Sequence, residues 1–133
     1  MRNRIRDIAL GAAAAALMLA PLPVLAADAA GEIVTAATHA DLASKASDLA
    51  GTQMHLHHAL NCLVGPGGNG FDPKNMNPCA NSGAGAIPDT TDAKKKAELE
   101  AAANLARTGL AAPDQATAQK DAAQVANALK AIK

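Results

Sequence analysis

The sequence has almost no aromatic residues: its 133 residues include one phenylalanine and neither tryptophan nor tyrosine. Half of the residues are hydrophobic, but most of these are alanine, which buries little apolar surface per residue. The shortage of aromatic and β-branched side chains argues against a β-sandwich or a barrel. A haem bound without covalent bonds would need a pocket of large apolar side chains, and the sequence offers few of them.

An excess of positive charge is also lacking, because twelve basic residues balance twelve acidic ones. This balance argues against a nucleic-acid-binding protein, which usually shows a basic excess. The catalytic and phosphate-binding patterns GxSxG, HExxH and GxxxxGK[ST] do not occur, so we expect no enzymatic activity. The CxxCH motif is absent as well, which argues against covalent c-type haem.

Residues 1–26 have the three-part layout of a secretory signal peptide. Three arginines in the first six residues precede an uncharged apolar run over 8–20, and two prolines and a small residue at Ala26 follow. The apolar run is shorter than the roughly 20 residues that span a bilayer, although an uncleaved membrane anchor is the alternative. We therefore expect cleavage near Ala26, and a mature protein over 27–133 that is periplasmic or secreted and has no membrane association after cleavage.

The mature chain reads as a single all-α domain. The pattern predicts a helix over 33–64, continuous or jointed near Gly51, and further helices over 89–108 and 113–132. Six of the ten glycines and four of the seven prolines lie between these helices, in a predicted loop over 65–88. The expected fold is a small antiparallel bundle of three helices, or four if the first breaks near Gly51.

Two apolar patterns support the bundle. Leucines recur every seven residues in the first predicted helix, which indicates one stripe facing a partner helix: Leu42, Leu49, Leu56 and Leu63. The last predicted helix has the alternating spacing of a buried face: Ala118, Ala122, Val125, Leu129 and Ile132.

The only two cysteines, Cys62 and Cys79, are predicted to form a disulfide. An isolated pair in an exported protein is most often oxidised, and a loop of this size is stabilised by about 3 kcal/mol when it is closed. The alternative is that both thiolates ligate a metal, but the CxxC spacing common in structural zinc sites is absent.

A cluster of histidines lies near the end of the first predicted helix, in the segment MHLHHALNC over 54–62. His55 and His58 are i,i+3 neighbours and can reach one ion, with Met54 or Met76 as candidate thioether ligands. Imidazole with thioether suits copper, and imidazole alone suits zinc as well. His39 lies 16 residues before His55, about 24 Å away along a straight helix, and is expected not to take part.

The disulfide would hold Cys79 against the end of the first predicted helix. We therefore expect Met76, which lies three residues before Cys79, and its neighbours to lie near His55 or His58 and to leave His57 exposed. The predicted function is therefore a small exported binding protein with a copper or zinc site beside the tethered loop. The alternative is a structural or protein-interaction bundle that binds a periplasmic protein partner and whose histidines are incidental.

Overall fold

The computed structural model describes residues 27–132, so the predicted signal peptide over 1–26 lies outside the described residues. This part of the chain is all-helical and contains no strand, as the sequence predicts. Its helices are α1 (Ala29–Ser44), α2 (Leu49–Val64), α3 (Ala86–Asp89), α4 (Ala93–Leu110) and α5 (Gln115–Ala131). Four of these helices are long, and α3 is a single turn.

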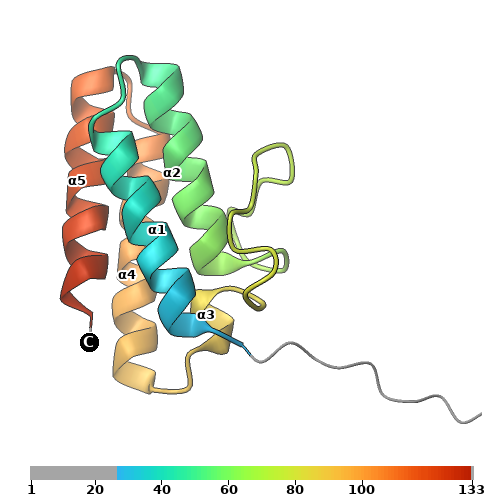
Figure 1. The fold of residues 1–133 in the computed structure, drawn as a ribbon. Helices are drawn as coiled ribbons and strands as arrows, with labels where there is room; N and C mark the ends of the chain where they lie inside the picture. Colours follow the sequence, from blue (N-terminus) through green and yellow to red (C-terminus); the bar gives the residue numbers. More distant parts are fainter. Residues whose placement is uncertain (1–26, 133) are drawn as a thin grey trace, which may run out of the picture.

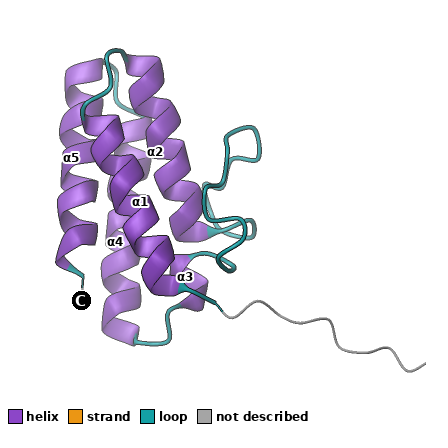
Figure 2. Cartoon of the chain, viewed as in Figure 1, coloured by secondary structure: helices purple, strands orange, loops and turns teal. Residues whose placement is uncertain are grey.

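The four long helices form an antiparallel bundle in which successive helices run in opposite directions (Figure 1). Helix α1 lies against α2 and α5, and α4 packs against the same two neighbours. The loop that connects α2 to α3 extends from one side of the bundle (Figure 2). Within residues 27–132, no helix combines the length and the apolar character that crossing a membrane requires.

An aspartate caps the N-terminus of each long helix. The side chain of each accepts a hydrogen bond from the backbone N–H three residues later, which satisfies one of the unpaired amides of a helix start. The donor–acceptor distances are 2.7–2.9 Å, and the four residues are Asp28, Asp48, Asp92 and Asp114.

Of the two alternatives predicted for residues 33–64, the structure has two helices and not one, and the break lies at residues 45–48, a few residues before Gly51. Gly51 lies in the first turn of α2, where its N–H donates to Asp48. Because the break separates Leu42 from the later leucines, the predicted heptad stripe is wrong in its first half: the Leu42 side chain on α1 is 44% exposed. The later part of the stripe, Leu56 and Leu63, is fully buried.

Small side chains make up much of the core. Alanines on all four long helices are completely buried, which lets the helices approach one another closely. The larger core side chains include Leu56, Leu60, Leu99 and Leu129. On α5 the predicted stripe is confirmed from Ala118 to Leu129, and Ile132 packs partly buried against the core.

The predicted disulfide between Cys62 and Cys79 is confirmed, with a Cα–Cα distance of 5.1 Å. Beside it, the buried side chain of Asn61 holds the loop to α2. Its amide donates to the carbonyl oxygens of Asp72, Asn75 and Met76 at 3.0–3.2 Å, and its oxygen accepts from the Asp72 N–H at 2.9 Å. The loop is thus attached by a covalent bond and by a buried amide.

The predicted loop over 65–88 ends earlier than expected, because α3 begins at Ala86. Two glycines allow the two ends of the loop to touch through their backbones. Gly65 has a φ of 65°, and a side chain there would meet the Ala84 carbonyl oxygen at 1.6 Å. Gly85 has a φ of 119°, and a side chain there would lie 2.6 Å from the Gly65 nitrogen. Any larger residue at either position would separate the loop ends.

Candidate metal centre

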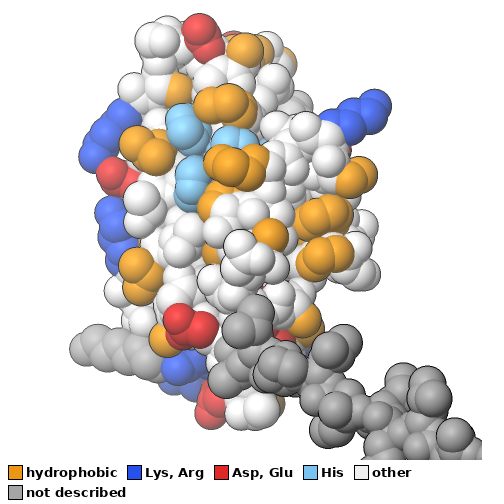
Figure 3. All heavy atoms as spheres, turned by 45° about the vertical axis from the view of Figure 1, so that its right-hand side comes forward, with side chains coloured by type: hydrophobic (Ala, Val, Ile, Leu, Met, Phe, Trp, Pro, Cys, Tyr) orange, Lys and Arg blue, Asp and Glu red, His pale blue; other side chains and the backbone are white. Residues whose placement is uncertain are grey.

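Three histidines from two helices meet at one place on the bundle surface. His39 comes from α1, and His55 and His58 come from α2. One ring nitrogen from each lies within 4.8 Å of the others, close enough for all three to hold one ion. The ring centroids are 5.1–5.6 Å apart. Histidine side chains are visible together on one face in Figure 3, with exposed hydrophobic side chains near them.

The hairpin formed by α1 and α2 explains why these residues meet. Residues at equal distances from the turn of an antiparallel helix pair lie opposite each other. His39 lies five residues before the end of α1, and His55 lies six residues after the start of α2. His58 is one turn further along α2, on the same face as His55. A short link over 45–48 therefore brings two distant sequence positions into contact.

The electrostatics of the site favour the neutral form of two of the three imidazoles, those of His39 and His58. Burial lowers the pKa of His39, and the neighbouring His58 and His55 lower it further. Burial also lowers the pKa of His58, followed by the effects of His55 and His57. A metal ion binds neutral imidazole, so a site that resists protonation is prepared to accept one.

One buried ring nitrogen of the trio lacks a hydrogen-bond partner. The Nδ1 atom of His58 is buried without a hydrogen-bond partner. The Nδ1 atoms of His39 and His55, in contrast, lie 3.4 Å apart and share a hydrogen bond, in which one neutral ring donates and the other accepts. A buried nitrogen without a partner costs free energy, which a bound cation would offset. The three residues therefore fit a metal ion chemically as well as geometrically.

The expectation that His39 lies too far from His55 to join the cluster was wrong. It assumed one continuous helix from His39 to His55, whereas the chain reverses between them. A local signal for the reversal is present in the sequence: Ser47-Asp48 precedes an apolar residue, and Asp48 begins α2 as a typical N-cap. Recognising that cap would have placed the turn before Gly51 and His39 opposite His55.

The expected position of the loop was also wrong in part. His57 is only 28% exposed at its side chain, and its Nδ1 lies 3.8 Å from a carboxylate oxygen of the loop residue Asp72. The loop thus approaches His57, which was expected to be open, whereas His55 and His58 gain a ring neighbour from α1.

The two methionines remain predicted ligands. Met54 immediately precedes His55 on α2 and is 42% exposed. Met76 lies in the loop and is 59% exposed.

Comparison of the chain with protein-family models, curated proteins and solved structures finds no match.

Proposed function

We propose that this protein binds one copper or zinc ion through His39, His55 and His58. The observation that carries the proposal is the convergence of three ring nitrogens within 4.8 Å. Of the histidines, the sequence suggested only His55 and His58, with Met54 and Met76 as candidate thioether ligands, and two histidines seldom make a tight site. A third ligand from a second helix makes the site tridentate and joins α1 to α2.

The ligand type limits the choice of metal. Imidazole binds copper and zinc well, whereas magnesium and calcium prefer oxygen ligands. Among divalent ions, copper generally binds a given nitrogen site more tightly than zinc does. If the thioether of Met54 becomes the fourth ligand, the soft sulfur further favours copper, and Cu(I) in particular.

We propose binding and not catalysis as the role of the site, and the periplasm as its location. The shifts in the pKa of His39 and His58 come from burial and from other histidines, and neither involves a carboxylate that could act as a base. The disulfide supports an oxidising compartment, because such bonds are rare in the cytosol. The signal-like sequence over 1–26 supports export.

The test is a metal titration of untagged mature protein with Cu(I), Cu(II) and Zn(II), followed by isothermal calorimetry. We expect one ion per chain. The His39→Ala variant should lose at least about 100-fold in affinity, since changing even a residue that only supports a metal ligand costs 10–100-fold.

The matched control is His57→Ala, which removes the histidine that is next to the site in sequence but outside the trio. Its affinity should stay close to that of the unchanged protein. Protein that stays free of all three ions would overturn the proposal and favour the rival function, a bundle that binds a protein partner. Equal losses in the two variants would contradict the ligand assignment.

A further inference from the structure

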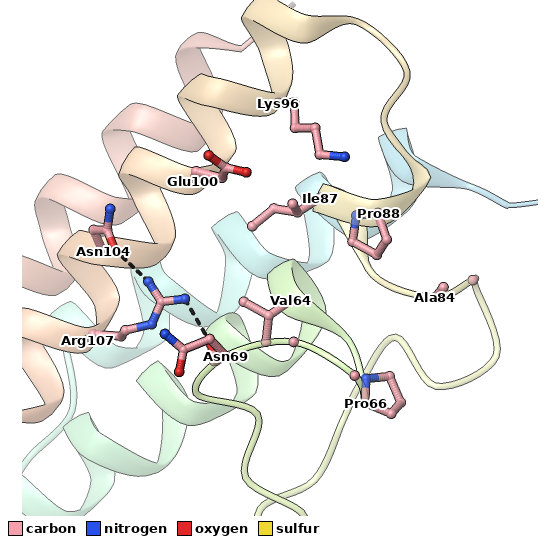
Figure 4. A pocket seen from close by; sticks show the side chains of 13 residues that line it. Val64, Pro66, Asn69, Ala84, Ile87, Pro88, Lys96, Glu100, Asn104 and Arg107 are labelled. Carbon is pink, nitrogen blue, oxygen red and sulfur yellow. Dashed lines mark hydrogen bonds between the residues drawn. The ribbon is translucent and has the colours of Figure 1, made fainter.

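A cavity of about 800 Å³ lies on the molecule, and none of the histidines lines it. It is open to solvent and is lined by one face of α4, by α3 and by both ends of the loop between α2 and α3 (Figure 4). This volume is within the range of about 300–1,000 Å³ that is typical of small-molecule sites.

One side of the cavity is apolar. Val64 at the end of α2, Pro66 in the loop, and Ile87 and Pro88 of α3 line it. In Figure 4, Val64 and Ile87 extend toward the middle of the cavity from two different helices. This surface suits an aliphatic or aromatic group and offers it no hydrogen bond from a side chain.

The opposite side is a polar stripe on α4. Lys96, Glu100, Asn104 and Arg107 line the cavity at spacings that place them on one helix face. Lys96 and Glu100 are i,i+4 neighbours of opposite charge, so their charges offset each other. The remaining charge in the cavity is the single positive charge of Arg107, which matches a ligand with one negative charge.

The structure holds the Arg107 guanidinium in position for such a ligand. One η nitrogen donates to the Asn104 side-chain oxygen at 2.6 Å, and the other donates to the Asn69 carbonyl oxygen at 2.8 Å. The Nε atom is buried. A guanidinium has five N–H groups, so one N–H remains on each η nitrogen. Two parallel N–H groups match the two oxygens of a carboxylate.

We propose that this cavity binds a small organic monocarboxylate with an apolar body. The carboxylate pairs with the η nitrogens of Arg107, and the apolar body covers Val64 and Ile87. This site is separate from the histidine trio and does not depend on metal binding.

The test is an NMR titration of the full mature protein with octanoate and phenylacetate, each compared with its neutral alcohol, octanol or 2-phenylethanol. We expect a carboxylate to shift the signals of Val64, Ile87 and Arg107, and to bind about tenfold more tightly than its alcohol. Failure of both carboxylates to shift these signals would overturn the proposal. So would equal binding of carboxylate and alcohol, or binding of inorganic phosphate alone.

Variants test the role of Arg107. Arg107→Gln should reduce carboxylate affinity to that of the alcohol, and Arg107→Lys should give an intermediate value because it keeps the charge without the two-pronged geometry. The matched control, Lys94→Gln, removes one positive charge from α4 outside the cavity and should leave binding unchanged. Equal effects of Arg107→Gln and Lys94→Gln would contradict the assignment. If Arg107→Gln fails to fold, the comparison of carboxylate with alcohol in the unchanged protein still decides.

Discussion

At the scale of single residues, Glu32 on α1 is an unusual charged residue, because its side chain is completely buried. One carboxylate oxygen accepts from the Gly85 N–H at 3.1 Å, and the other has no hydrogen-bond partner. Burial, and next the negative charge of Asp89, raise the pKa of Glu32 to about 7.

This raised pKa predicts a pH-dependent stability. Because the folded pKa lies above the ordinary value of 4.5, the folded protein holds the proton more tightly than the unfolded chain does. The contribution to stability is present below about pH 4.5 and is lost as the pH rises toward 7. Glu32→Gln keeps the shape without the charge, so at pH 8 it should be more stable than the unchanged protein by at most about 3 kcal/mol.

Urea unfolding at pH 4.5 and pH 8 measures this effect as the difference between the Glu32→Gln variant and the unchanged protein. His39 and His58, whose lowered pKa favours folding at higher pH, act in the opposite direction but cancel in that difference. Glu98→Gln on the exposed side of α4 is the control and should show little change. A Glu32→Gln difference that is the same at both pH values would contradict the assignment.

At the scale of helices and loops, the disulfide and the histidine trio belong to different parts of the fold. The trio is built by the α1–α2 hairpin, whereas the disulfide joins the end of α2 to the loop. Replacing Cys62 and Cys79 together with serine should therefore lower the free energy of unfolding by about 3 kcal/mol. Metal affinity should change little, because neither the turn over 45–48 nor any of the three histidines is touched.

Urea unfolding and a metal titration of the same double variant check both parts of this prediction. Mass spectrometry of the unchanged protein, with and without reductant, checks that the disulfide is present. The oxidised protein should be lighter than the reduced protein by the mass of two hydrogens. Loss of metal binding in a variant that remains folded would show that the loop, and not the helix pair, positions the trio.

Helices were predictable where their signals are local. The last helix was predicted over 113–132 from its apolar spacing, close to the observed Gln115–Ala131, and the disulfide was predicted from an isolated pair of cysteines behind a predicted export signal. The break over 45–48 was missed because the leucine repeat runs through it by coincidence. The single turn of α3 was missed because proline and glycine around it suggest a loop.

At the scale of the whole molecule, the candidate metal site depends on tertiary structure that the sequence does not reveal directly. His55 and His58 could be paired from helical spacing alone, because that relation is fixed within one helix. His39 joins them only because α1 folds back against α2, and the approach of the loop to His57 depends on contacts made by Asn61. Relations within one element were predictable, and relations between elements were not.

A bound ion would connect α1 and α2 at a point away from the disulfide. The disulfide and Asn61 hold the loop to α2, and Glu32 holds α1 to the far end of the loop at Gly85. The histidine trio adds a potential link nearer to the turn between α1 and α2. If the ion binds the folded protein and not the unfolded chain, metal binding would stabilise the folded hairpin by mass action.

The most direct test of the proposed metal site is a long-range proton–nitrogen NMR spectrum of the histidine rings, recorded before and after one equivalent of Zn(II). We expect one ring nitrogen each of His39, His55 and His58 to shift strongly, while the nitrogens of His57 keep their positions. A response confined to His55 and His58, a response that includes His57, or no response at all would contradict a three-histidine site between α1 and α2.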